Sequence, residues 1–454
     1  MIINSKIERW RAWQAATPNR RIFSAILILV VMTGVVKLAA TGKELIVAGY
    51  FGVSEAVDAF LIAFLLPMFA INVLAGSFSA ALMPTYIRTR DSKGLIVAQQ
   101  LFSSAMALGI LFLVVAAIVL AVIAPTILPI LGSGFSANTM GLTQNLFYWL
   151  LPVLVFTGIS QLYSTAMNAG ERFALVALAP TVTPICAVIF LVLLVDRWNI
   201  QALAIGTLFG SVVEMLILAY IATRRGISFC PRWGGGITEE LRVVIGQYMP
   251  MVAGAFLMSG TVLVDQAMAA MLESGSVATL NFANRVVALV LGVGSMALGT
   301  AVLPHFSRMV ADNNWSGVHH TFKTYALLIT FLSIPITAIL FLFSESIISV
   351  LFERGAFEAE DTRLVGQVQA YYVLQIPFYI LGILTVRLIS SLRSNHILMW
   401  GAGISLSLNI ILNFVFMRWL GVSGIALSTA CVYAVSFLFL ILMLAKRLRE
   451  VRLT

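Results

Sequence analysis

The sequence is poor in charge. Asp, Glu, Lys and Arg make up 10% of its 454 residues, whereas a typical soluble domain carries about 25%. Hydrophobic residues make up 60%, and apolar runs of about 20 residues, each long enough to cross a bilayer, recur along the whole chain. These proportions exclude an ordinary soluble domain and predict an all-α polytopic membrane protein.

Residues that commonly carry catalysis or bind metals are also scarce. The three cysteines, Cys186, Cys230 and Cys431, have no disulfide or metal-site spacing, and the four histidines have no metal-site spacing either. No glycine-rich loop ending in Gly-Lys-Ser or Gly-Lys-Thr is present, so the sequence shows no nucleotide-driven motor. We therefore predict that the protein is not an enzyme and has no catalytic residue, no cofactor and no metal site.

About twelve apolar runs are long enough to be transmembrane helices. The predicted spans are 22–49, 57–85, 98–123, 146–168, 173–195, 200–222, 241–270, 276–305, 322–350, 365–392, 396–417 and 421–445.

Two short internal sequence similarities, here called echoes, indicate that these spans form two halves. The pattern of residues 81–88, Ala-Leu-Met-Pro-x-x-x-Arg, returns at 301–308 as Ala-Val-Leu-Pro-x-x-x-Arg, and a second echo aligns Pro152 with Pro377. Two six-helix halves in the same orientation form a parallel repeat, an arrangement typical of transporters that rock two bundles about a central site. The predicted parts are a cytoplasmic basic arm at 1–21, lobes at 22–225 and 241–446, a cytoplasmic inter-lobe linker at 226–240 and a cytoplasmic basic tail at 447–454.

The distribution of Lys and Arg predicts the orientation. With the N-terminus inside, the N-terminal arm, the even-numbered connections and the C-terminal tail hold 20 of the 28 basic residues, and the opposite side holds four. We therefore expect both termini in the cytoplasm. The net charge of +9 is then explained by membrane topology and by contact with anionic lipid headgroups, rather than by binding to nucleic acid.

Polar and small residues follow one face of two predicted spans. At 100° per residue, each set falls within about 40° of arc. The stripe in the second span consists of Asp58, Asn72, Gly76 and Ser79, and that in the eighth of Asn281, Arg285, Gly292 and Gly299. Small residues also let helices pack closely, which is the alternative explanation for the glycines and serines. Packing gives no reason to bury the guanidinium of Arg285, so we expect a substrate cavity lined by the polar members of both stripes.

Other charged residues inside the spans need partners or water, because a charge in hydrocarbon costs about 2.5–3.5 kcal/mol on insertion scales. Lys37 and Glu44 lie seven residues apart and share a helix face. Lys43 lies next to Glu44, so the two form either part of a site or a self-neutralising pair. Asp265 lies near a helix end, where solvation explains it as well as a site does, and Arg387 either serves a site or snorkels to the interface.

Three blocks of sequence resemble the MurJ (MviN) family of lipid-linked glycan flippases. This family belongs to a superfamily that also holds MATE exporters and Wzx polysaccharide flippases. The blocks are 51–84, with Phe51-Gly52 and Asp58-Ala59-Phe60, then 283–308, which begins Ala-Asn-Arg, and 351–357, Leu-Phe-Glu-Arg-Gly-Ala-Phe. They occur in one order within a resemblance that runs from about Ile22 to Lys446.

The resemblance implies a V-shaped cavity between two six-helix lobes, whose cationic lining receives the diphosphate of an undecaprenyl-linked saccharide. By position, Asp58 and Arg285 match polar cavity residues of the family, Lys43 and Glu44 occupy its Arg-Asp pair, and Arg387 matches an arginine. The chain departs from the family pattern elsewhere. Ile71-Asn72 replace Arg-Arg, Gly76 replaces Glu, and Arg393-Ser394-Asn395 replace Gly-Asp-Thr.

The leading hypothesis is a flippase of the bacterial cytoplasmic membrane that moves a polyprenyl-diphosphate-linked saccharide by alternating access. The cargo is lipid II or the repeat unit of an exported polysaccharide, and a glycan polymerase or synthase is a candidate partner. The substrate-binding candidates are Lys43, Arg285, Asp58, Asn72, Asn281, Lys37 and Arg387, and the candidates for a coupling cation are Glu44 and Asp265.

The alternative hypothesis is a MATE-like, cation-coupled exporter of small organic molecules. Such an exporter predicts carboxylates as the dominant charges of the cavity. The bases assigned to the cavity are at least as numerous as the acids, which favours an anionic cargo.

Overall fold

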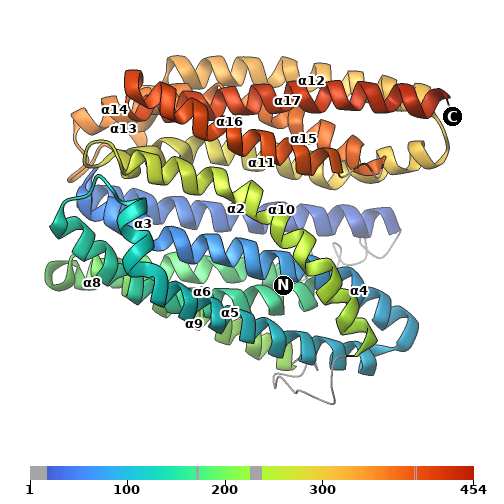
Figure 1. Ribbon diagram of the computed structural model, residues 1–454, viewed down its shortest axis with the longest axis horizontal. Helices are drawn as coiled ribbons and strands as arrows, with labels where there is room; N and C mark the ends of the chain where they lie inside the picture. The colour runs from blue at the N-terminus through green and yellow to red at the C-terminus, as the bar shows by residue number, and fades with distance from the viewer. Residues whose placement is uncertain (1–17, 170–172, 225–237, 393, 395, 454) are drawn as a thin grey trace, which may run out of the picture.

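The computed structural model describes residues 18–169, 173–224, 238–392, 394 and 396–453, and every regular element in these ranges is helical (Figure 1). The predicted arm at 1–21 and linker at 226–240 lie largely outside the described residues. The helices of the first half are α2 (Pro18–Phe51), α3 (Glu55–Ala70), the π-helix η1 (Ile71–Gly76), α4 (Ser77–Lys93), α5 (Leu95–Leu131), α6 (Ala137–Ala169), α7 (Phe173–Leu178), the 3-10 turn η2 (Ala179–Thr181), α8 (Val182–Trp198) and α9 (Gln201–Arg224). Those of the second half are α10 (Glu239–Ala269), α11 (Ser276–Ala311), α12 (Trp315–Leu342), α13 (Ser344–Phe352), α14 (Ala359–Val373), α15 (Ile376–Ser391), α16 (His396–Leu420) and α17 (Val422–Leu453).

The helices confirm a polytopic all-α membrane protein. Eleven helical segments of the described chain are long and apolar enough to cross a membrane. A further helix, α2, is 34 residues long, which exceeds the about 20 residues that a span requires. One predicted span is wrong in its extent: 322–350 divides at Phe343, where α12 ends and the short α13 begins and packs against α14.

The second predicted span is continuous from Glu55 to Lys93 but contains the π-helix η1. A π turn holds more residues per turn than an α turn, so the 100° spacing assumed for the polar stripe breaks inside η1. Asp58 lies in the protein interior at 1% exposure, whereas Asn72 is exposed.

Helices pack mainly within their own half. Figure 1 shows the helices up to α9 on one side and those from α11 onward on the other, while α10 crosses between them. The contacts agree, because α10 packs against α4 and α5 and also against α16.

The apolar cores reveal where the halves are joined. One core combines residues of both halves, among them Ala59 and Phe60 of α3 with Phe282 and Ala283 of α11. The other cores are built either from the first half with the beginning of α10 or from the second half alone. The halves are therefore joined at the end of the molecule where α3 begins at Glu55, here called the α3 end. They have separate cores toward the opposite end, where α17 terminates at Leu453, here called the α17 end.

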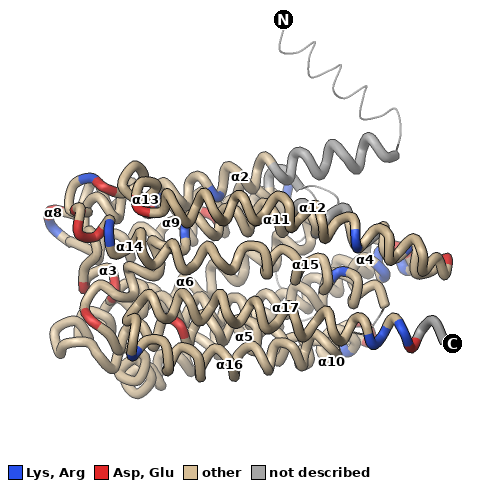
Figure 2. Tube along the Cα trace, turned by 90° about the horizontal axis from the view of Figure 1, so that it is seen from above, with Lys and Arg blue, Asp and Glu red and all other residues tan. Residues whose placement is uncertain are grey.

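Charge is distributed unequally between these two ends. Figure 2 shows Lys and Arg concentrated at the α17 end, and Asp and Glu mainly at the α3 end. The positive-inside rule predicts that the α17 end lies in the cytoplasm. The orientation of the termini stays a prediction.

Backbone contacts between the halves close the α3 end. The N–H of Ala356, in the loop between α13 and α14, donates to the carbonyl oxygen of Gly49 at 2.8 Å. Gly52 has φ +56°, and a Cβ at that position would overlap the carbonyl oxygen of Ala356. Only glycine combines the left-handed conformation with this close approach.

We expect Gly52→Ala to lower the free energy of unfolding by about 2–4 kcal/mol, because backbone strain and overlap with Ala356 add. Gly421 is a matched control, since it has the same φ of +56° and no atom near its missing Cβ. Gly421→Ala should lose only about 1 kcal/mol. Thermal unfolding of the two purified variants measures the difference, and equal losses would contradict a close joint at the α3 end.

Candidate functional site

A cavity of about 900 Å³ lies along the second half of the protein. Its walls come from α10, α11, α15, α16 and α17, and α2 contributes Lys37. The lining includes five of the residues predicted from the sequence, which are Lys37, Asp265, Asn281, Arg285 and Arg387. Its size lies at the upper end of the about 300–1,000 Å³ usual for ligand sites.

Arg285 is the central cation of the cavity. Its Nη2 lies 2.8 Å from Oε1 of Glu44, and Nε and Nη2 donate to Oδ1 of Asn281 at 3.1 and 2.8 Å. Asn281 precedes Arg285 by one helical turn, so α11 itself aligns the pair. Lys43 reaches the same Glu44 oxygen at 2.9 Å. The three charged groups carry a net charge of +1, and α2 and α11 come from different halves.

The accessible members of this cluster are the bases. The side chain of Glu44 is 7% exposed, whereas that of Arg285 is 32% exposed. Lys43 and Glu44 do not belong to the cavity lining, although Glu44 holds Arg285 in place. This arrangement stabilises the guanidinium while leaving part of it open to a ligand.

Two more cations lie along the same cavity. Lys37 is exposed on α2, and Arg387 lies on α15, one turn before that helix ends. The Nε atom of Arg387 is buried and has no hydrogen-bond partner in the described part of the chain. With Arg285, the described lining therefore holds three bases and one carboxylate, that of Asp265. The cavity favours an anionic ligand.

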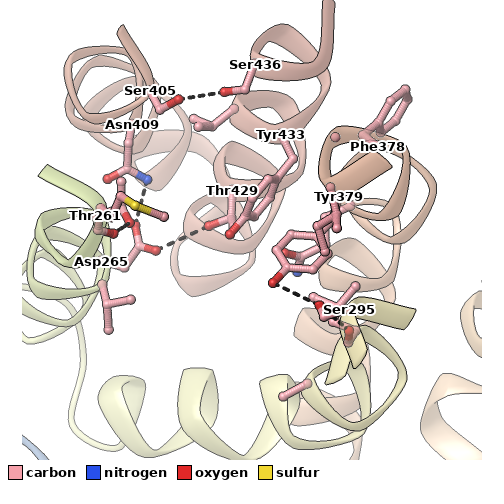
Figure 3. A pocket seen from close by; sticks show the side chains of 18 of the residues that line it. Thr261, Asp265, Ser295, Phe378, Tyr379, Ser405, Asn409, Thr429, Tyr433 and Ser436 are labelled. Atoms are coloured by element: carbon pink, nitrogen blue, oxygen red, sulfur yellow. Dashed lines mark hydrogen bonds between the residues drawn. The ribbon is translucent and has the colours of Figure 1, made fainter. Parts of the chain in front are cut away.

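Asp265 lies on α10 in a cluster of amide and hydroxyl groups. Its Oδ1 accepts hydrogen bonds from Nδ2 of Asn409 at 2.9 Å and from Nδ2 of Asn413 at 2.7 Å. Its Oδ2 lies 3.3 Å from the hydroxyl of Thr429, as Figure 3 shows. The amide oxygens of both asparagines are buried without a donor among the described residues. Both asparagines thus direct their amide nitrogens to the carboxylate and leave their amide oxygens unpaired within the described chain.

Asp58 lies outside the cavity, in the joint between the halves. Its Oδ2 accepts from the backbone N–H of Gly275 and its Oδ1 from that of Ala278, both at 2.7 Å. These groups belong to the first turn of α11, where backbone N–H groups lack helical partners and a negative charge is stabilised by the helix dipole. Asp58 of α3 therefore caps a helix of the other half. Asn72 is exposed on η1 and also lies outside the lining.

Several residues of the cavity lining and of the cluster around Asp265 were not predicted. Asn409 and Asn413 are four residues apart in an apolar helix, and that spacing of two amides was a signal that they share a face. Tyr379, Tyr433 and the serines of the lining carry no comparable signal, because Tyr and Ser are common in packed membrane helices.

The fold is that of transporters of the MOP superfamily. A solved structure titled "Lipid II flippase MurJ, inward closed conformation" matches with a TM-score of 0.79 and 23% identity, covering 92% of this chain and 87% of the other. An inward-facing multidrug-resistance MATE transporter of the MOP superfamily matches with a TM-score of 0.76 and 12% identity, covering 94% and 99%. At these identities the two structures establish the fold alone.

Sequence comparison defines the family. The model of the family described as lipid II flippase MurJ matches residues 47–453. Probable lipid II flippases MurJ from Vibrio cholerae and Thermotoga maritima are each 26% identical, over 91% and 88% of this chain and 81% and 80% of their own lengths. The chain belongs to the MurJ family. It is a transporter rather than an enzyme, and a multi-pass protein of the inner membrane.

We expect Asp58→Ala to loosen the joint at the α3 end, because the first turn of α11 loses its charged acceptor. Spin labels at Tyr50→Cys and Glu273→Cys, both exposed positions on opposite sides of the joint, would report this in a cysteine-free background. The distance distribution should become longer and broader.

Glu55→Ala is the matched control, since Glu55 also lies on α3 but bonds to Thr139 of the same half. It should leave the distribution unchanged. An unchanged distribution in Asp58→Ala would show that the shared apolar core alone holds the halves together.

Proposed function

We propose that the protein carries a polyprenyl-diphosphate-linked saccharide across the inner membrane by alternating access, with lipid II as the first candidate cargo. The observation that carries this proposal is Arg285, a partly exposed guanidinium in a cavity whose described lining holds more bases than acids. Family membership supports the same cargo, because the family is described as lipid II flippases.

The unused donors of Arg285 suit a diphosphate. Asn281 and Glu44 occupy Nε–H and both N–H groups of Nη2. The two N–H groups of Nη1 then remain for a ligand, and each can donate a charge-assisted hydrogen bond to a phosphate oxygen. Lys37 and Arg387 supply additional positive charge at other points of the lining.

The cores suggest how access alternates. In this structure the halves are joined at the α3 end by a shared apolar core and by Asp58, and their cores are separate toward the α17 end. We assign the α17 end to the cytoplasm, so the cavity would load from the inner leaflet. Transfer to the outer leaflet requires the joint at the α3 end to open, and Asp58 must release α11 for that to happen.

Export of small organic cations is the weaker alternative. A cation cargo requires carboxylates as the dominant charges of the cavity, and the described lining holds one carboxylate, that of Asp265, against three bases. The similarity to MATE transporters concerns the fold.

We further propose that Asp265, rather than Glu44, binds a coupling cation. The charge of Glu44 is already balanced by Arg285 and Lys43. Around Asp265, in contrast, the amide oxygens of Asn409 and Asn413 lack donors, and carboxylate, amide and hydroxyl oxygens are the ligands of hard cations. A glycan polymerase or synthase that uses the translocated lipid stays a predicted partner.

Complementation tests the cargo. In a bacterial strain whose own lipid II flippase can be switched off, expression of this protein should restore growth. Arg285→Ala should abolish rescue at unchanged membrane abundance, because the diphosphate loses its main ligand. Arg363→Ala is a matched control, since Arg363 is an exposed arginine at the α3 end and outside the lining. Rescue by Arg285→Ala would refute the role of the guanidinium, and a well-expressed protein without rescue would direct the search to polysaccharide repeat units.

Thermal unfolding tests the cation site. Sodium chloride should raise the unfolding temperature of the purified protein relative to choline chloride at equal ionic strength, because a ligand that binds only the folded state stabilises it. Asp265→Ala should abolish the difference. Glu214→Gln, which alters a buried carboxylate bonded only to Thr183 in the described contacts, should retain it. A sodium response that survives in Asp265→Ala would place the cation elsewhere.

A further inference from the structure

One wall of the cavity is built from aromatic rings rather than charges. Tyr379 of α15 and Tyr433 of α17 make an edge-to-face contact with ring centroids 5.1 Å apart and planes at 81°. Both rings line the cavity and are partly exposed, and Phe378 beside them is 37% exposed. Figure 3 shows Tyr379 and Tyr433 beside the same space as the Asp265 cluster. The rings lock one another in place while leaving surface open to a ligand.

Serine hydroxyls complete this wall, and their hydrogens are already used. Ser405 donates to the carbonyl oxygen of Gly401 at 2.7 Å. A hydroxyl has one hydrogen, so in the 2.7 Å contact between Ser405 and Ser436 the donor is Ser436. Ser295 likewise donates to the carbonyl oxygen of Leu291 at 2.7 Å. What the three serines offer to a ligand is therefore lone pairs, which accept hydrogen bonds.

Aromatic faces beside hydrogen-bond acceptors match one part of the proposed cargo. A saccharide has apolar C–H faces that pack on rings and many O–H or N–H donors. A polyprenyl tail has no donors, and it would leave the serine acceptors unpaired after desolvation, which is unfavourable. The diphosphate is also a poor match, because it has acceptors only and is repelled by Asp265.

The spacing of residues along α11 agrees with separate positions for the diphosphate and the saccharide. Arg285 and Ser295 both line the cavity and are ten residues apart, which is about 15 Å along a helix. A diphosphate at Arg285 can therefore extend a short saccharide toward Ser295 and the ring of Tyr379, whose hydroxyl lies 3.4 Å from the Ser295 hydroxyl.

We infer that the wall formed by Tyr379, Tyr433, Ser295, Ser405 and Ser436, here called the tyrosine wall, is a saccharide subsite. It selects a neutral, donor-rich sugar such as an N-acetylhexosamine. This inference rests on the proposed function and adds the part of the cargo that the second half recognises.

Binding of two probes to the full-length protein in nanodiscs tests the inference. The probes are farnesyl diphosphate and the same lipid bearing an N-acetylhexosamine disaccharide. Wild type should bind the saccharide probe more tightly. Tyr379→Leu should raise the Kd of the saccharide probe about tenfold and leave that of farnesyl diphosphate unchanged. Ser436→Ala should raise the saccharide Kd about threefold to tenfold, because one acceptor is lost.

Controls separate this inference from the proposed function. Tyr379→Phe keeps the ring and should retain most of the saccharide preference, and Tyr220→Leu, which alters an exposed tyrosine of α9 outside the cavity, should change neither Kd. Arg285→Ala should weaken both probes. If wild type binds both probes equally, or if Tyr379→Leu weakens both alike, the saccharide subsite is refuted and the flippase proposal stands. If wild type binds neither probe, the proposed cargo fails and the subsite fails with it.

Discussion

The polar contact at the centre of the joint is one carboxylate. Asp58 lies on α3 and accepts hydrogen bonds from two backbone N–H groups at the start of α11, so this side chain connects the two halves through backbone groups that, apart from proline, every residue retains. A buried carboxylate is stable in the membrane only while such donors surround it. Opening the joint therefore requires other donors or water to replace those of α11, and under the proposed alternating access this exchange is a barrier between the two conformations.

The same constraint organises the charges of the cavity. Glu44 is surrounded by Arg285 and Lys43, and Asp265 by two asparagines and a threonine. Both acids therefore have charged or hydrogen-bonding partners, and bases outnumber acids in the described cavity lining. An anionic headgroup can thus enter without displacing an acid, while the uncharged tyrosine wall receives the neutral part of the same molecule. One cavity in this way separates the chemistry of a charged headgroup from that of a sugar.

Much of this was predictable from the sequence. The apolar runs located most membrane-spanning helices to within a few residues, because about 20 consecutive apolar residues in a membrane have few alternatives to a helix. Arg285 and Asn281 were found together because they are one turn apart on a single helix. Asp58 and Asn72 were expected in the cavity, but neither belongs to its described lining, since Asp58 is buried in the joint and Asn72 is exposed. The π-helix at Ile71–Gly76 was not predicted either, because no composition signal distinguishes it from an α-helix.

The sequence by itself determined the membrane class, the approximate positions of most spans, bases at least as numerous as acids among the charges assigned to the cavity and, through its motif blocks, the family. These properties depend on composition and local periodicity, because the partitioning of each segment between hydrocarbon and water depends on its own residues. Only the tertiary structure decided that Glu44 holds Arg285 across 241 residues of chain, that Asp58 caps a helix of the other half and that Tyr379 meets Tyr433. Such contacts depend on how helices pack against one another, and helices distant in sequence carry no local signal of their partners.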